Sequence, residues 1–400
     1  MRAVPVLAAV ALALAGPARA QSSSGMPPAA APATAAPPVS PVPGLSPAPP
    51  PVSSPAAATT PSPIDWPAVI TPRLLLQSDI LIAHHGPSLP ALEDGTVHPG
   101  FYLRRARIGL DAADGPWRAR LIFEATARSE VADAALDQLA GELDRGQPRP
   151  TEAYVSFAPH RAFALSAGAL RVPIGLSRQI DEGDLRLPER ARIITRLTPD
   201  FRMGAAASGD LGILQYALGG YSASPSFGAG FRDGGTLLVL RLNAETIGPL
   251  GLAPQLRRTT DPWYRWWRFS VGLSAFYASL PGANESGVGG DGQFQWARFL
   301  FTGEVLWSHS TAIDRVGFTL EPGVFVVPDR LELVARAEWM NDDVGPTTPA
   351  DAWGAALGTT FYSASRRVRI QAAYTLRRAA LDPGAGRTAG WAVLRATFTM

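Results

Sequence analysis

Polar and apolar residues alternate one for one along long stretches of this 400-residue chain. In the stretch 367–377, the residues Arg367, Arg369, Gln371, Ala373, Thr375 and Arg377 alternate with Val368, Ile370, Ala372, Tyr374 and Leu376. In a β-strand, a period of two sends each set of side chains to its own face of the sheet. The pattern recurs over about 330 residues, with turn signals between the segments. It predicts an all-β chain that closes into a transmembrane antiparallel barrel, apolar outside and polar inside.

About sixteen segments have the strand pattern. They lie at 72–83, 100–111, 116–128, 151–158, 162–171, 203–209, 212–221, 236–246, 266–278, 290–296, 299–309, 315–327, 331–340, 351–362, 366–377 and 389–399. Most links that follow an even-numbered segment are short, and most of the others are longer. Short turns on one rim and long loops on the other are typical of an outer-membrane barrel.

One link breaks this rule, because residues 247–265 form a long connection on the rim that should carry short turns. It ends at an aromatic group, Trp263, Tyr264, Trp266 and Trp267. Such residues either anchor a barrel at the lipid–water boundary or pack in the ordinary way.

The membrane explains why closure matters. In hydrocarbon, no backbone amide can be left unpaired, so strands can span a bilayer only in a sheet without edges. About sixteen strands enclose a water-filled lumen, whereas about eight leave a space that side chains fill. The strand count therefore predicts a pore.

The N-terminal region predicts export. Residues 1–20 contain Arg2, an apolar run and Ala18-Arg19-Ala20, which together are typical of a signal peptide. Residues 21–65 contain 14 prolines, and we expect a disordered periplasmic linker there. The barrel domain is expected over residues 66–400. The linker is interpreted either as a passive tether or as a contact with peptidoglycan.

The composition excludes several classes of site. Cysteine is absent, so the chain has no disulfide, thiolate metal site or cysteine nucleophile. All 36 basic residues are arginine, and removal of residues 1–20 leaves 34 of them against 34 acidic residues. His84-His85 has no spaced third ligand, and no enzyme motif occurs. We therefore expect no enzyme activity, no metal, no cofactor and no nucleic-acid partner.

Two groups of arginines are expected inside the lumen. Arg105 and Arg107 on one strand and Arg118 and Arg120 on the next face the same way. Four guanidinium groups on one hairpin predict an anion-attracting wall. The alternative is a solvated lumen surface that Glu124 and other carboxylates balance.

The second group lies in the link 173–202, the longest connection between predicted strands that are well defined. Its cations include Arg178, Arg186, Arg190, Arg192 and Arg196, with five carboxylates among them. A loop of this length beside a wide lumen is expected to fold inward as a constriction whose charges set ion selectivity. The alternative is an exposed surface loop.

The chain resembles the phosphate-selective porin O and P family of Gram-negative outer membranes. The resemblance spans about residues 72–400 and rests on an ordered set of motifs. These are Leu103–Leu110, Glu152–Val155, Gly168–Gly175, Pro188–Arg190, Arg202–Gly204, Pro328–Arg336 and the final strand that ends at Phe398. It implies a sixteen-stranded, usually trimeric porin whose third loop enters the channel, with basic residues that hold phosphate. By position, Arg171 stands where family members often have a lysine, and Arg178 where a glutamate is common.

The sequence therefore predicts a passive outer-membrane porin of a Gram-negative bacterium, with a modest preference for small anions such as phosphate. Its expected partners are outer-membrane lipid and two further copies in a homotrimer. Two alternatives stay open at this point: a non-selective diffusion pore, and a structural outer-membrane protein tethered to peptidoglycan through its linker.

Overall fold

The structure is a computed structural model in which sixteen strands form one closed barrel. It describes residues 69–84, 100–125, 149–223, 235–245, 252, 254–256, 267–280, 283–310, 314–343, 349–380 and 386–400. The predicted signal peptide and Pro-rich linker lie outside the described residues, as do His85, Trp263, Tyr264 and Trp266. No helix in the described part of the chain is long and apolar enough to cross a membrane.

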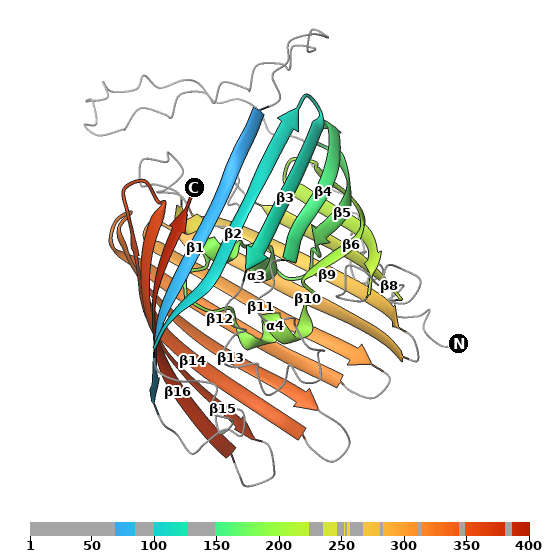
Figure 1. Cartoon of the computed structure of the whole chain (residues 1–400). Coiled ribbons are helices and arrows are strands. Elements are labelled where there is room, and N and C mark those ends of the chain that lie inside the picture. Colours follow the sequence, from blue (N-terminus) through green and yellow to red (C-terminus); the bar gives the residue numbers. More distant parts are fainter. Residues whose placement is uncertain are drawn as a thin grey trace, which may run out of the picture. The chain divides into compact units, whose positions relative to one another are not determined.

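Every strand pairs antiparallel with its neighbours in sequence, and β1 pairs with β16 to close the sheet (Figure 1). The strands are β1 Val69–His84, β2 Gly100–Asp114, β3 Trp117–Ala125, β4 Arg149–His160, β5 Phe163–Arg171, β6 Phe201–Asp210, β7 Leu214–Ser222, β8 Thr236–Glu245, β9 Arg268–Leu280, β10 Ala283–Trp296, β11 Phe299–Ser310, β12 Asp314–Val327, β13 Leu331–Asp343, β14 Pro349–Tyr362, β15 Val368–Ala380 and β16 Gly386–Thr399. Each one overlaps one of the sixteen predicted segments. The predicted fold class is confirmed.

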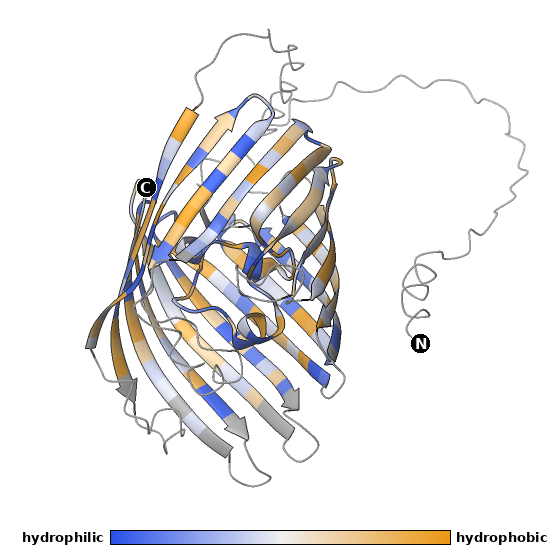
Figure 2. Ribbon diagram, turned by 45° about the vertical axis from the view of Figure 1, so that its right-hand side comes forward, coloured by the Kyte–Doolittle hydropathy of each residue, from blue (hydrophilic) through white to orange (hydrophobic). Residues whose placement is uncertain are grey.

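The two faces of the sheet differ as the alternation predicts. In β15, Arg369 and Gln371 are 1% and 2% exposed, whereas Val368, Ile370 and Tyr374 are about 40% exposed. Hydrophobic and hydrophilic residues follow one another along the strands (Figure 2). Large apolar side chains that are exposed on the outside and polar ones that are buried on the inside suit a barrel solvated by lipid.

The strand β10 differs from its prediction, because it begins at Ala283 and not at residue 290. The added segment contains Gly287, Gly289 and Gly290, and glycine has low strand propensity. The tertiary structure makes use of these glycines. A Cβ atom at Gly287 would lie 2.3 Å from a ring carbon of Phe276 on the neighbouring strand.

Candidate functional site: a constriction loop inside the barrel

The connection from β5 to β6, residues 172–200, folds into the barrel and not over its rim. It contains α3 Leu176–Gln179, the 3-10 turn η1 Glu182–Asp184 and α4 Arg192–Leu197. These elements are drawn inside the ring of strands in both ribbon views (Figures 1 and 2). The loop forms hydrogen bonds with strands on the opposite side of the barrel, up to β16. The predicted inward course of this link is therefore confirmed.

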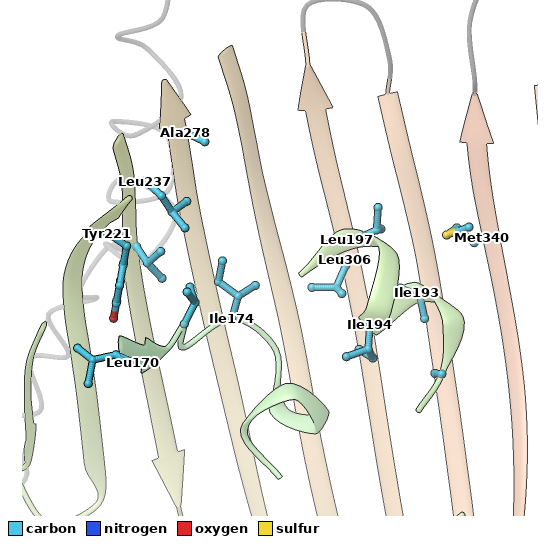
Figure 3. Packing of buried hydrophobic residues seen from close by; sticks show 13 residues of the cluster. Leu170, Ile174, Ile193, Ile194, Leu197, Tyr221, Leu237, Ala278, Leu306 and Met340 are labelled. Atoms are coloured by element: carbon cyan, nitrogen blue, oxygen red, sulfur yellow. The ribbon is translucent and has the colours of Figure 1, made fainter. Parts of the chain in front are cut away.

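Apolar residues seat the loop against the inner wall. Ile193 and Ile194 of α4 are both 0% exposed and belong to a cluster with Leu306 of β11 and Met340 of β13 (Figure 3). A second small cluster places Leu187 against buried residues of β13, β14 and β15. Burial of a large aliphatic side chain contributes about 1.5–3 kcal/mol, so the loop is stabilised independently of its charges.

The loop enters the lumen at Gly175, which has a φ of +69°. A Cβ atom there would lie 2.8 Å from an oxygen of Glu304 on β11. Glycine is therefore required both by the left-handed backbone and by the close approach of the carboxylate. That carboxylate accepts hydrogen bonds from the backbone N–H of Leu176 (2.9 Å) and of Ser177 (2.8 Å).

The wall formed by β11–β16 holds the loop mainly through its backbone. The N–H of Arg192 donates to Glu338 at 2.8 Å. The wall side chains Thr360, Gln371 and Arg395 donate to the carbonyl oxygens of Arg186, Leu185 and Pro188. Contacts to backbone fix the path of the loop whatever side chains it carries.

One loop arginine forms a buried ion pair with this wall. The Arg186 guanidinium donates to Glu332 on β13 at 2.8 Å, and the two side chains are 4% and 0% exposed. Tyr362 donates a further hydrogen bond to the same carboxylate at 2.7 Å. The arginine also occupies the space beside Gly323, where a Cβ atom would lie 1.6 Å from its Nη2 atom. Arg186 is thus an anchor of the loop.

The wall formed by β2–β5 meets the loop through pairs of charged side chains and through hydrogen bonds from Arg171 to the carbonyl oxygens of Arg178 and Gln179. Arg105 binds Glu124 at 2.8 Å and Glu182 of η1 at 3.0 Å. Arg171 binds Glu152 at 3.2 Å and Asp181 at 2.6 Å. These pairs connect the start of β2, the end of β5 and the tip of the loop in one network.

The four arginines predicted as a cationic wall differ in their surroundings. Arg107 binds Glu124 at 2.5 Å, and Arg120 binds Asp111 at 2.7 Å and Glu152 at 3.0 Å. Carboxylates therefore balance three of the four arginines, Arg105 among them. This agrees with the alternative prediction of a lumen surface on which carboxylates balance the arginines. Arg118 is exposed, next to the turn between β2 and β3.

The remaining predicted arginines all lie in or beside the loop. Arg190 binds Glu182 at 2.8 Å and donates to the carbonyl oxygens of Ser177 and Ile180. Arg178 of α3 binds Asp200 at 3.2 Å. Arg192 and Arg196 are half-buried at the two ends of α4. The structure thus brings most of the predicted residues together around one constriction, with their carboxylate partners.

A cavity of about 280 Å³ lies between η1, the β1–β3 wall and the turn that joins β14 to β15. Its charged lining consists of Arg73, Arg107, Arg120, Arg366, Arg367, Asp181 and Asp184. Opposite this cavity, on the side of β10–β13, the space beside the loop is about 20 Å³. A space of that size holds about one water molecule. Of these two spaces beside the loop, the larger is therefore the one whose charged lining is mainly arginine.

The two ends of η1 differ in their acidity. Burial would raise the pKa of Glu182, but Arg190 and Arg105 hold that pKa well below its ordinary value of 4.5. Burial raises the pKa of Asp184 above its ordinary value of 3.8, against the attraction of Arg369. Glu182 is consequently a permanent charge of the constriction, whereas Asp184 gains a proton more readily on acidification.

Sequence reasoning missed the wall partners of the loop. Glu304 binds the start of α3, and Asp79 of β1 accepts two hydrogen bonds of 2.7 Å from Arg395. A signal was present, because Glu332 and Glu338 already stood on the polar face of a predicted strand. An inward-facing carboxylate in a strand marks a partner for an inward-folding loop, but the sequence does not say which one.

The comparisons agree on the fold. No family model and no curated protein matches the chain. Among solved structures, the trimer form of in-vitro folded OmpT of Vibrio cholerae has a TM-score of 0.56 at 13% identity, over 83% of this chain and 99% of that one. The anion-selective porin from Comamonas acidovorans has a TM-score of 0.54 at 11% sequence identity, and the match covers 83% of this chain and 100% of that one. The outer membrane channel DcaP of Acinetobacter baumannii has a TM-score of 0.54 at 10% sequence identity, and the match covers 83% of this chain and 97% of that one.

At these identities the likeness is one of fold. The neighbours are outer-membrane proteins of Gram-negative bacteria, and the outward-facing apolar surface described above suits the same bilayer. The predicted outer-membrane location agrees with both observations. The chain has the closed sixteen-stranded barrel fold of the outer-membrane porins.

Proposed function

We propose that this chain is a passive outer-membrane porin: a water-filled channel for small hydrophilic solutes with a modest preference for anions such as phosphate. The observation that carries the proposal is the arginine-lined cavity beside the constriction loop. Five guanidinium groups and two carboxylates line it, so it presents more positive than negative charge to a passing solute. Rings of charged side chains at a constriction are what sets ion selectivity in channels.

The degree of selectivity follows from the pairing of those charges. Asp111 and Glu124 bind three of the lining arginines, namely Arg73, Arg120 and Arg107. A paired guanidinium still offers donors to an anion, but its field is partly cancelled at a distance. This favours a weak preference over strict phosphate specificity, and a non-selective diffusion pore is the second candidate. Phosphate as the solute rests on the resemblance of the sequence motifs to those of the phosphate-selective porin O and P family.

The same proposal covers assembly and processing. The solved neighbour from Vibrio cholerae is described in a trimer form, which supports a homotrimer for this chain. Residues 1–20 would be removed as a signal peptide, and residues 21–65 would serve as a periplasmic linker that touches peptidoglycan or acts as a simple tether. Deletion of residues 21–63 tests the linker: envelope integrity would fall while conductance stays unchanged if the linker has a structural role.

The channel itself is tested with purified protein in planar bilayers under a salt gradient. We expect discrete conductance steps and a reversal potential of the sign that anion preference produces. Phosphate added against chloride should reduce the chloride current if it binds in the cavity. A reversal potential of the opposite sign would eliminate the anion reading, and one near zero would favour the non-selective pore.

A further inference from the structure

The link between β8 and β9 is long on the rim where the other described turns are short, and its described part lies inside the barrel. This part comprises Leu252 and the 3-10 turn η2 Pro254–Leu256. Gln255 is 2% exposed, although it belongs to no strand. A residue in a rim turn is expected to be solvated, so this burial shows that η2 has partners within the lumen.

Three hydrogen bonds identify these partners. Gln255 Nε2 donates to the carbonyl oxygen of Asp184 at 2.6 Å. Arg366 Nη1 donates to the carbonyl oxygen of Gln255 at 3.1 Å. Gln293 Nε2 donates to the carbonyl oxygen of Leu252 at 3.4 Å. The segment therefore touches the constriction loop, the β14–β15 turn and the inner face of β10 at once.

The anchor at the β14–β15 turn is itself held in place. Arg366 Nη2 donates to Asp329 at 3.0 Å, and its guanidinium lies 4.9 Å from the ring centroid of Tyr362. Gln293, the anchor on β10, is 3% exposed and faces inward. These contacts make η2 a braced element that reaches the loop from the opposite rim.

The turn η2 lies on the side of the loop where the space is small. Gln255 and Gln293 line the 20 Å³ space on the side of β10–β13, and Arg366 lines the 280 Å³ cavity on the other side. On the narrow side, η2 meets η1 at the contact between Gln255 and Asp184. On the wide side, the loop and the wall leave room for a solute.

We infer that η2 is a second constriction element, which seals the lumen between the loop and the β10–β13 wall, and that Gln255 is the residue that holds the seal. Solutes are thereby confined to the arginine-lined side, so Gln255 determines selectivity without binding the solute. The inference rests on the proposed channel function. It assigns a role in permeation to a connection on the short-turn rim.

The test compares single-channel conductance and reversal potential for the wild type, Gln255→Ala and Gln255→Glu. Both variants lose the donor to the carbonyl oxygen of Asp184, and the glutamate keeps the side-chain length. We expect each to open a second path, with conductance rising about 1.5-fold or more and anion preference falling. Asn284→Ala, the loss of an exposed amide at the other end of β10, is the matched control and should leave both values unchanged.

The possible failures are distinguishable. A wild-type protein that forms no conducting pores contradicts the proposed function. Wild-type pores whose conductance and reversal potential do not change in both Gln255 variants overturn the inference about η2. The folded state of each variant is checked by the shift in gel migration of unheated against heated protein, and only folded barrels are compared. If Gln255→Ala fails to fold, the comparison with the wild type is made with Gln255→Glu alone.

Discussion

The constriction loop is held differently by the two walls that it touches. On the β11–β16 side, wall side chains bind the loop backbone, and Ile193 and Ile194 are completely buried. On the β2–β5 side, ion pairs with the loop carboxylates accompany the hydrogen bonds that Arg171 donates to the loop backbone. The side chain of Asp181 in one of these pairs is 50% exposed. The first wall, called the seat below, holds the loop through buried contacts. Beside the second wall the contacts are partly exposed to water, and the larger cavity lies there.

This difference separates stability from permeation. Contacts to backbone carbonyls and N–H groups do not depend on the loop side chains, whereas the buried pair of Arg186 and Glu332 does. Ion pairs beside water contribute less to stability, because solvent screens them. Substitutions at the two walls should therefore affect different properties of the protein.

The largest effect is expected at the seat. Glu332→Ala removes the nearer carboxylate of the buried Arg186 guanidinium and leaves only Glu321, at 3.6 Å. Loss of one partner of a buried ion pair costs about 3–5 kcal/mol. We expect a clear fall in the midpoint of denaturant unfolding in detergent. Glu285→Ala is the control, because its pair with Arg315 is 3.7 Å long and about 30% exposed. Equal losses in both variants would contradict a special role of the buried pair in stability.

A smaller loss of stability with a larger change in selectivity is expected at Glu182. Glu182→Gln removes its pairs with Arg105 and Arg190 and deletes one negative charge from the tip of the loop. Arg190 keeps two carbonyl acceptors, so the cost is that of hydrogen bonds to a charged group, about 1.5–3 kcal/mol. The reversal potential should shift toward stronger anion preference. No shift would show that the tip does not face the permeation path.

Acidification should increase anion preference through Asp184. Burial raises its pKa above 3.8, so it gains a proton at a higher pH than an ordinary aspartate and removes a negative charge from the cavity. The stability that this raised pKa contributes is present at low pH and is lost as pH rises through the raised value. The loop should therefore stay seated when pH falls from about 7 to about 5.

At lower pH, protonation of Glu182 should begin to weaken the attachment of the loop. Its folded-state pKa is well below 4.5, so its stabilising contribution is present above 4.5 and is lost as pH falls through the lowered value. As pH is lowered, the reversal potential of the wild type should begin to change above the ordinary aspartate pKa of 3.8, and this change should be absent in Asp184→Asn. A change that persists in Asp184→Asn would assign the effect to another group.

The smallest effect is expected at Arg118. It is exposed beside a turn, and surface substitutions of this kind are usually within about 0.5 kcal/mol. Arg118→Gln should have nearly wild-type stability and selectivity, whereas Arg120→Gln, two residues further along β3, should lose anion preference. If both variants behave alike, the rim contributes to the selectivity as much as the cavity does.

Local pattern was sufficient to predict the barrel but not the contacts inside it. A period of two is a property of neighbouring residues, so all sixteen strands could be predicted along the chain. The largest part missed is the glycine-rich start of β10, whereas other strand ends differ by two or three residues. The length of the β5–β6 link predicted that it enters the lumen. The pairing of Arg186 with Glu332 could not be predicted, because 146 residues separate them and the path of the loop decides which carboxylate it meets.

The β8–β9 link shows a second limit. Its unusual length was visible in the sequence, but the aromatic residues at its end directed the interpretation to the lipid boundary. Trp267 is 49% exposed and stacks on Phe269 at 5.9 Å, whereas Gln255 of the same link lies inside the barrel. A glutamine among apolar and basic neighbours carries no pattern, since its burial depends on Asp184 and Arg366, which are far away in the sequence.

The seam of the barrel has a consequence for biogenesis. Arg395 of β16 binds Asp79 of β1 and donates to the carbonyl oxygen of Pro188, so one buried side chain joins the two seam strands to the loop. The three parts are far apart in sequence, and contacts of that kind form late because they must await chain closure. In a sheet whose β1 and β16 are not yet paired, Arg395 would lack its pair with Asp79. Closure of the β1–β16 seam and attachment of the loop at Pro188 are therefore coupled through the same side chain.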